Sequence, residues 1–206
     1  MTAAAPLVAG AGHPEGVRLG RGFFARPAPQ VARELLGCWL VRSLPGGVLR
    51  AQLLETEAYL GGADPASHAY RGQTTRNRVM FGPPGVAYVY FVYGMHHCLN
   101  IVTGAEGDPQ AVLLRAALIP GGTSAAVTWA GPGRLARGLG VDLACNGLDL
   151  CAPHPGALWL EQGLPPRGWS MRTGSRVGVR DLSPLRFSLA APARRTAGRA
   201  RKKRAP

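Results

Sequence analysis

The sequence predicts one mixed α/β domain of the α+β type, with a curved, mainly antiparallel β-sheet flanked by short helices. Its 206 residues suit a single domain, and that length can bury a substantial core. Twenty-nine glycines and eighteen prolines indicate many turns and short elements rather than a helical bundle. Short apolar runs between these turns are typical of strands joined as hairpins.

A helix is predicted first, within residues 23–40. Val31, Leu35 and Leu36 fall at helical spacing there, and Gly37 is well placed to end the helix. Later elements are shorter and follow from local apolar runs and glycines. They are a strand at 112–117, a helix at about 131–139, and strands at 157–160, 176–179 and 185–189.

Two β-hairpins are predicted in the first half of the chain. The first joins a strand at 38–41 to a longer strand at 48–59 through a Pro-Gly-Gly turn. The second joins residues 86–93 to residues 98–102 across a short polar connection. Between the hairpins lies a polar, turn-rich segment, 61–84, which is long enough to predict a functional loop.

The chain is strongly basic, with a formal net charge of +13 and a sequence pI near 10.9. Residues 1–16 are predicted to be a flexible leader, 17–189 the folded domain and 190–206 a disordered basic tail. Seven basic residues and no acidic one lie between Arg194 and Arg204, and taking these from +13 leaves the body at +6. A polyanionic partner such as nucleic acid is expected, and a soluble basic protein with a disordered tail is the alternative.

The cysteine, histidine and apolar patterns predict no metal, no cofactor and no membrane contact. The four cysteines have no C-x-x-C spacing, which suits structural thiols in a reducing cytoplasm. In His96-His97-Cys98, neighbouring side chains leave opposite faces of a strand, so at most His96 and Cys98 could act together. The longest apolar run, 86–93, is too short to span a bilayer, and the N-terminus has no signal-peptide pattern. The protein is predicted to be cytoplasmic.

Two carboxylates stand close together near the end of the long strand predicted at 48–59. Glu55 and Glu57 share strand parity, so their side chains leave the same face. Like charges this close favour different environments, one tied up structurally and one poised as a base. A solvent-facing acidic strand end is the alternative, but Leu54 and Ala58 make the strand largely apolar, and a carboxylate there needs partners.

Three tyrosines lie within six residues, at Tyr88, Tyr90 and Tyr93. Tyr88 and Tyr90 share a face, while Tyr93 lies on the other face or in the turn beside Gly94. Core aromatics in a buried strand are the simpler interpretation, but three buried hydroxyls would need three partners. An aromatic ring at a turn also suits insertion between DNA bases.

Together with His68, Arg76 and Arg78, these residues resemble the alkyladenine (3-methyladenine) DNA glycosylase family. The resemblance spans roughly residues 19–188, and several motifs in the same order along the chain make it specific. The matching motifs are Glu55 to Tyr59, Asp64 to His68, Gln73-Thr74, Arg76 to Arg78, Tyr88 to Tyr90, Tyr93 to Met95, Cys98, Asn100-Ile101, Leu113 to Ala116, Gly131 to Leu135, Leu158 to Glu161, Arg176 to Val179 and Leu185 to Phe187. The 180–184 segment departs from the family, because it is shorter than the usual loop before the last strand.

The resemblance implies roles for the site residues. Glu57 would be the general base that activates the water attacking C1′ of the flipped nucleotide, and Arg115 would brace the pocket and this water. Tyr59 would stack on the extruded base, His68 would hydrogen-bond its edge, and Tyr88 would orient His68. Glu57 and Arg115 would thus be the catalytic residues, and Tyr59, His68 and Tyr88 would belong to the base-binding pocket.

The resemblance also implies how the enzyme would handle duplex DNA. A base cannot be reached in the stack, so it must be flipped out and the gap must be filled. Tyr93, with Met95 beside it, would wedge into the duplex. Tyr90 would stack on the second side of the extruded base, and Asn100 would meet the purine edge where guanine carries its 2-amino group, which would disfavour normal guanine.

The predicted function is therefore that of a monofunctional DNA repair glycosylase, a hydrolase that removes alkylated or deaminated purines and leaves an abasic site. Its partner would be double-stranded DNA, with Arg76 and Arg78 at the DNA backbone, and it would act as a monomer near the nucleoid without a cofactor. The alternative is a non-catalytic protein that binds lesions without excising them, which would not need Glu57. A lyase is disfavoured, since the only lysines are Lys202 and Lys203 in the tail.

Overall fold

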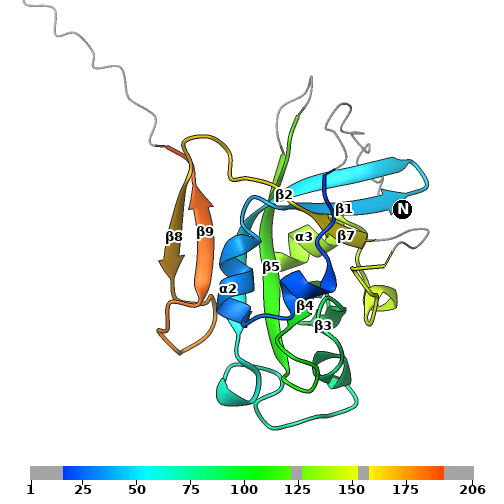
Figure 1. Ribbon diagram of the computed structural model, residues 1–206, viewed down its shortest axis with the longest axis vertical. Helices are drawn as coiled ribbons and strands as arrows, with labels where there is room; N and C mark the ends of the chain where they lie inside the picture. The colour runs from blue at the N-terminus through cyan, green and yellow to red at the C-terminus, as the bar shows by residue number, and fades with distance from the viewer. Residues whose placement is uncertain (1–15, 122–126, 153–157, 193–206) are drawn as a thin grey trace, which may run out of the picture.

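The computed structural model describes residues 16–121, 127–152 and 158–192. In these ranges the chain forms one curled, antiparallel β-sheet with a few short helices against it (Figure 1), which confirms the predicted α+β class. The strands are β1 (Trp39–Leu44), β2 (Gly47–Tyr59), β3 (Ala87–Val92), β4 (His96–Thr103), β5 (Gln110–Ile119), β6 (Val127–Ala130), β7 (Leu158–Glu161), β8 (Ser170–Gly174) and β9 (Arg186–Ala190). The helices are α1 (Arg21–Phe24), α2 (Ala28–Glu34) and α3 (Pro132–Gly138), with the 3-10 turns η1 (Gly61–Ala63), η2 (Arg78–Phe81) and η3 (Leu143–Cys145).

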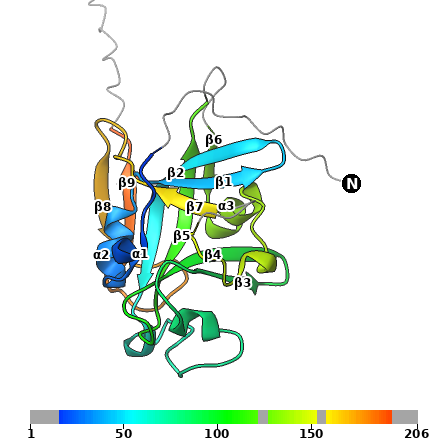
Figure 2. The ribbon, with the colours of Figure 1, turned by 45° about the vertical axis from the view of Figure 1, so that its right-hand side comes forward.

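Strand β2 is the centre of the sheet. The main path runs β3-β4-β5-β2-β1-β7, β6 pairs with β5, and β8 pairs with β9, which in turn pairs with β2. The start of β2 lies beside β1, whereas its end, from Glu55 to Glu57, lies between β5 and β9. Figures 1 and 2 show the β8–β9 ribbon on one side of the molecule and the β3–β4 hairpin on the other. The end of β2 is therefore held by strand neighbours along both edges.

The core joins helices α2 and α3 to the sheet. Leu53, Leu114 and Leu135 are fully buried in it, and burial of each such side chain contributes about 1.5–3 kcal/mol. Thr56 of β2 also faces this core, where its hydroxyl donates to the carbonyl oxygen of Ala32 in α2 at 2.8 Å. Because side chains alternate along a strand, the residues on either side of Thr56 face away from α2.

Both predicted hairpins are confirmed, since β1 pairs with β2 and β3 with β4, each antiparallel. The helix predicted within 23–40 is α2, although it ends at Glu34, before the expected stop at Gly37. Gly37 has a φ of 88°, a left-handed value that glycine adopts without strain. A Cβ at this position would lie 2.4 Å from the backbone nitrogen of Pro165, so the close approach also requires glycine.

The strand predicted at 176–179 is wrong. These residues form a turn between β8 and β9, in which Gly178 has a φ of 76° and Arg176 turns inward to a buried ion pair with Asp64. Locally, the valines at 176–179 favour a strand. The tertiary contacts of Arg176 outweigh this preference. The strand that pairs with β9 is β8 instead, whose largely exposed residues carry little apolar signal.

The predicted leader and tail lie almost entirely outside the described residues, which begin at Gly16 and end at Pro192. Strand β9 ends at Ala190, just beyond the predicted end of the domain at residue 189. No helix in the described ranges is long and apolar enough to cross a membrane.

Candidate active site

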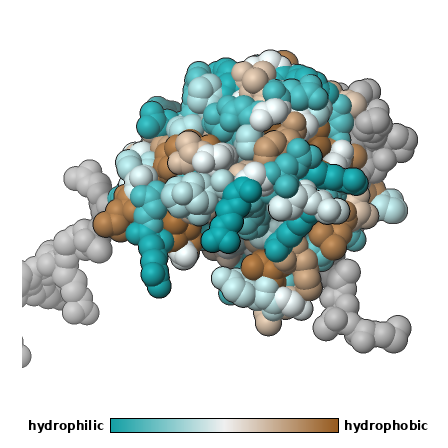
Figure 3. All heavy atoms as spheres, turned by 90° about the horizontal axis from the view of Figure 1, so that it is seen from below, coloured by the Kyte–Doolittle hydropathy of each residue, from teal (hydrophilic) through white to brown (hydrophobic). Residues whose placement is uncertain are grey.

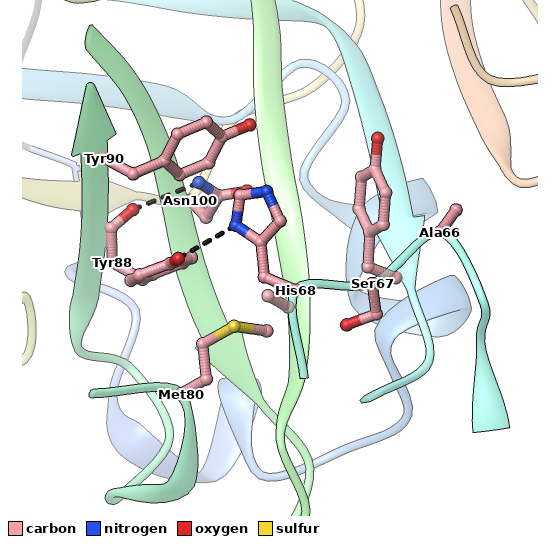
Figure 4. Close-up of a pocket in the computed structure, with 9 residues that line it drawn as sticks. Ala66, Ser67, His68, Met80, Tyr88, Tyr90 and Asn100 are labelled. Atoms are coloured by element: carbon pink, nitrogen blue, oxygen red, sulfur yellow. Dashed lines mark hydrogen bonds between the residues drawn. The ribbon is translucent and has the colours of Figure 1, made fainter. Parts of the chain in front are cut away.

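A pocket opens where the end of β2, the 61–84 segment and strands β3 to β5 meet (Figure 4). All five residues predicted to bind the base line this pocket: Tyr59, His68, Tyr88, Tyr90 and Asn100. The rest of the lining is Ala66, Ser67, Met80 and Ala111. Aromatic and small apolar groups thus surround a few hydrogen-bonding groups, an arrangement that suits a flat heterocyclic ligand.

Three aromatic rings form one side of the pocket (Figure 4). The His68 and Tyr90 rings meet edge to face with centroids 4.5 Å apart, and the Tyr88 and Tyr90 centroids are 5.5 Å apart. Arg76, exposed on the 61–84 segment, places its guanidinium 5.8 Å from the Tyr90 ring centroid and donates to the carbonyl oxygen of Phe91 at 3.3 Å. This wall therefore combines π surfaces with a nearby positive charge.

His68 is positioned through both its side chain and its backbone. Its Nδ1 lies 2.9 Å from the Tyr88 hydroxyl, and its carbonyl oxygen accepts from Asn77 Nδ2 at 2.8 Å. The pocket leaves His68 partly open to solvent, yet the groups packed around the ring desolvate it and, with the charge of Arg76, lower its pKa. Burial raises the pKa of Tyr88, so its phenol can donate to Nδ1 and leave Nε2–H for a ligand.

Asn100 is fixed in the pocket wall by a bond across the β3–β4 pair. It is only 4% exposed, and its Nδ2 donates to the carbonyl oxygen of Tyr88 at 3.1 Å (Figure 4). Asn100 and Tyr88 are directly paired across β3 and β4, so the pairing of the strands fixes the geometry of this bond. The amide is therefore held in one orientation at the edge of the pocket.

Glu57 lies behind Tyr59, fully buried. Its Oε1 accepts from the backbone N–H of Val177 at 2.7 Å and lies 3.3 Å from Arg115 Nε, and its Oε2 accepts from the Tyr59 hydroxyl at 3.0 Å. Burial, followed by the adjacent charge of Glu57, raises the pKa of Tyr59, which keeps this phenol a donor. A carboxylate has about four acceptor sites, so the two hydrogen bonds from Tyr59 and Val177 leave room for another donor, such as a water.

Glu55 and Glu57 share one arginine, as their common strand parity predicts. Arg115 Nε donates to Glu55 Oε1 at 3.0 Å, and Arg186 Nη1 lies 3.5 Å from the same oxygen. The Glu55 side chain is 24% exposed and that of Glu57 is 0% exposed. The two carboxylates therefore occupy different environments, and a solvent-facing strand end is excluded for Glu57. A bulge in the β2–β5 pairing lies at Glu55, the kind of irregularity that redirects side chains near active sites.

The β3–β4 hairpin ends in an exposed aromatic tip. Tyr93 is 86% exposed and Met95 is 68% exposed. Tyr93 and Gly94 have φ values of 53° and 66°, and the Met95 N–H donates to the carbonyl oxygen of Val92 at 3.2 Å, which is the pattern of a type I′ turn. Among the described residues, Tyr93 is the only non-glycine residue with a positive φ. Its ring lies outside the core.

The side of the molecule that carries the 61–84 segment is both basic and apolar. Arg71, Arg76 and Arg78 are exposed on this segment, and Arg78 begins η2. Figure 3 views the molecule from below, from the side of this segment in Figure 1, and hydrophilic and hydrophobic side chains lie next to one another on that face. Such a surface offers charges for phosphates and apolar groups for sugars and bases.

Several groups at the site had no role in the sequence-based prediction. The Val177 N–H, which donates to Glu57, and the Ala58 carbonyl oxygen, which accepts from Arg176 at 3.1 Å, are backbone groups, which carry no side-chain signal. Met80 and Ala111 also line the pocket, but no local sequence pattern indicates that they do. Arg176 lay within a matched motif, but its partners are remote in sequence. Within the described ranges, no group of three or more His, Cys, Asp or Glu could hold a metal ion.

Comparison with known proteins agrees with this geometry. Residues 22–193 match the family model for methylpurine-DNA glycosylase (MPG). A protein of Streptomyces avermitilis is 50% identical over 188 residues, covering 84% of this chain and 88% of that protein. A protein of Carboxydothermus hydrogenoformans is 46% identical over 184 residues, covering 83% of this chain and 94% of that protein. Both carry the name "Putative 3-methyladenine DNA glycosylase".

An aromatic pocket beside a buried carboxylate, on a basic surface, suits a hydrolase that acts on a base of DNA. The chain belongs to the methylpurine-DNA glycosylase family. It is accordingly a DNA N-glycosylase, a hydrolase of DNA repair, as its motifs predicted.

Proposed function

We propose that this enzyme extrudes an alkylated or deaminated purine, such as 3-methyladenine, from duplex DNA and hydrolyses its N-glycosidic bond with a water activated by Glu57. The observation that carries the proposal is the double contact of Tyr59. Its ring lines the pocket, while its hydroxyl donates to Glu57 at 3.0 Å. A base stacked on Tyr59 would therefore have its sugar close to a buried carboxylate.

The pocket suits an electron-poor purine. Tyr59 and Tyr90 would stack on the two faces of the base, and π surfaces favour a cationic ring such as an alkylated purine. The Nε2–H of His68 would donate to the base edge, and Asn100 would face the position of the guanine 2-amino group. The relatives named as 3-methyladenine DNA glycosylases support this substrate class.

The chemistry follows from the partners of Glu57. The water oxygen forms a bond to C1′ as the bond from C1′ to the purine nitrogen breaks, and the base leaves with that electron pair. Glu57 takes the proton of the water, while Arg115 and Val177 N–H hold the carboxylate in place. An abasic site remains. No lysine lies in the described residues to form a Schiff base, which favours a monofunctional enzyme.

Extrusion requires a group to fill the gap in the duplex. The exposed ring of Tyr93, with Met95 beside it, would take this place, while Arg76 and Arg78 would bind phosphates of the DNA backbone. The enzyme would act on double-stranded DNA as a monomer, in the cytoplasm at the nucleoid.

Glu57→Gln tests the proposal, because the amide keeps the shape of the side chain but cannot take a proton. Purified enzyme in excess is incubated with duplexes that contain each candidate lesion, and alkali cleavage reports the abasic sites. The variant should lose about 10²- to 10⁴-fold in excision rate while still binding the lesion duplex. Glu34→Gln is the matched control, since Glu34, the last residue of α2, forms a surface ion pair with Arg26.

Two outcomes would contradict the proposal. If Glu57→Gln excised at more than about a tenth of the wild-type rate, the general-base role would be wrong. If the wild-type protein bound lesion duplexes tightly but released no base, the protein would be a lesion-binding protein instead.

A further inference from the structure

The segment between β8 and β9 is tied to the end of β2 by one buried arginine. The Arg176 side chain is 0% exposed. Its Nη1 donates to the carbonyl oxygen of Ala58 at 3.1 Å and to Asp64, and its Nη2 donates to Asp64 Oδ1 at 3.0 Å and to Asp181 Oδ2 at 2.9 Å. One guanidinium thus joins three segments: the end of β2, the segment after it, and its own loop.

The backbone of Ala58 is held on both sides by this loop. Its N–H donates to the carbonyl oxygen of Leu185 at 2.8 Å, and its own carbonyl oxygen accepts from Arg176. Ala58 lies between Glu57 and Tyr59 in the sequence. Fixing its peptide groups therefore fixes the directions in which the carboxylate and the phenol leave the strand.

Arg176 also sets the position of the backbone donor to the carboxylate. The next residue is Val177, whose N–H donates to Glu57 Oε1 at 2.7 Å. Val177 is 50% exposed, so burial of its side chain does little to hold the donor. The guanidinium itself lies 4.7 Å from the centroid of the Tyr59 ring, on which it stacks.

Asp64 extends the same contacts to the pocket wall. It accepts from the backbone N–H groups of Leu60 at 3.1 Å and Ala66 at 3.0 Å, and Ala66 begins the run that lines the pocket. Burial acts to raise the pKa of Asp64, but the hydrogen bonds from Arg176 and from these two backbone groups outweigh it and lower the pKa. The turn after β2 is thereby anchored to an ionised carboxylate.

We propose that Arg176 is a positioning residue for the glycosylase reaction, holding Glu57 and Tyr59 in their reactive arrangement through the backbone around them. The proposal rests on the function proposed above for Glu57. A buried ion pair is weak evidence for stability alone, because its desolvation offsets much of its attraction. The bonds of Arg176 instead converge on the groups that flank the reacting carboxylate, so its loss affects the rate of the chemical step.

The test compares Arg176→Lys with Arg172→Lys. Lysine keeps the charge but cannot reach Ala58 and both carboxylates at once, whereas Arg172 is exposed on β8. Excision is measured under single turnover, with enzyme raised until the rate constant no longer changes, and binding of the lesion duplex is titrated separately. A partly unfolded preparation needs more protein to saturate, but its maximal rate constant stays unchanged.

Arg176→Lys should lower the saturating rate constant at least about 10-fold, because displacements near 1 Å can cost about 100-fold in a catalytic site. Its Kd for the lesion duplex should stay within about 3-fold, and Arg172→Lys should match wild type in both measurements. If Arg176→Lys does not fold, Asp64→Asn replaces it with the same criterion. A saturating rate constant near wild type, or a loss confined to binding or to thermal stability, overturns the proposal.

These outcomes separate the inference from the proposed function. Wild-type excision that survives Glu57→Gln would remove the function on which the inference rests. Excision that depends on Glu57 but is unchanged in Arg176→Lys would leave that function standing and reject the positioning role alone.

Discussion

The Tyr88 hydroxyl oxygen lies 2.9 Å from Nδ1 of His68. The contact makes the protonation state of the histidine matter, because Nδ1 accepts from the phenol only when the ring is neutral. Desolvation, followed by the charge of Arg76, lowers the pKa of His68 and so favours the neutral ring. A protonated ring would lose this acceptor and would also repel a cationic base.

Excision should therefore depend on pH through His68. The pKa of His68 lies below the ordinary histidine value, so activity should persist at neutral pH and fall only at pH values below that ordinary value. The loss of activity should be larger for a cationic lesion than for a neutral one. Arg76→Gln should raise the pKa of His68 and move this acid limb to higher pH. Single-turnover rates between about pH 5 and 8 measure the limb.

Arg78→Gln is the control for the pH experiment. Arg78 is also exposed on the 61–84 segment, but only Arg76 contributes its charge to the lowered pKa of His68. Equal displacement of the acid limb in the two variants, or no displacement in Arg76→Gln, would show that His68 does not govern it.

Tyr93→Ser should impair extrusion of the base rather than chemistry. Loss of the ring removes stacking worth about 1–3 kcal/mol, by analogy with base–aromatic contacts. The penalty should shrink when the lesion lies in a mismatch or bulge, where unstacking is already partly done. Excision rates on paired and bulged substrates measure the difference.

Backbone strain is a second effect at Tyr93, because its φ is 53°. Asparagine tolerates positive φ better than serine does, so Tyr93→Asn removes the ring with less strain. Equal losses in both variants would assign the effect to the ring. A loss that is the same on paired and bulged substrates would mean that Tyr93 does not act as a wedge.

Asn100→Ala should increase release of undamaged guanine, because it removes the amide that we propose faces the 2-amino position. Discrimination by one contact in a pocket is about 10- to 100-fold, which sets the expected gain. Hypoxanthine lacks the 2-amino group, so its excision serves as the internal control and should change much less. Unchanged release of guanine would leave Asn100 with only its structural bond to the Tyr88 carbonyl oxygen.

Local sequence patterns predicted the hairpins but not every strand. The β1–β2 and β3–β4 hairpins follow from apolar runs on either side of short turns, which are local features. The 176–179 segment looks like a strand locally, but the burial of Arg176 against Asp64 decides its shape. Strand β8 pairs through its backbone while its side chains stay mostly exposed, so its residues give no apolar pattern.

The site was predictable to the extent that it depends on side chains. Strand parity placed Glu55 and Glu57 on one face, and the resemblance to a family named five residues that line the pocket, Tyr59 among them. The remaining contacts are long-range and involve backbone groups. The bond from Val177 N–H to Glu57 joins residues 120 positions apart, and no sequence pattern indicates it.

The basic tail should raise affinity for DNA without setting lesion preference. Its seven positive charges between Arg194 and Arg204 have no aromatic neighbour, so they can contact phosphates but cannot read bases. Truncation after Pro192 leaves β9 intact, since that strand ends at Ala190 in its pairing with Ser170. The truncated enzyme should bind lesion and undamaged duplexes more weakly by similar factors.

Salt dependence gives the quantitative test of the tail. Each engaged phosphate contributes about −0.9 to the slope of log K against log salt, so full engagement of seven charges would change the slope by roughly 6 and partial engagement by less. A full-length variant with those seven residues changed to glutamine should flatten the slope as truncation does, because charge rather than length is responsible. Single-turnover excision at saturating enzyme should barely change in either variant. A slope that stays at the wild-type value, or a changed ratio of rates between two lesions, would show that the tail does something other than bind phosphates.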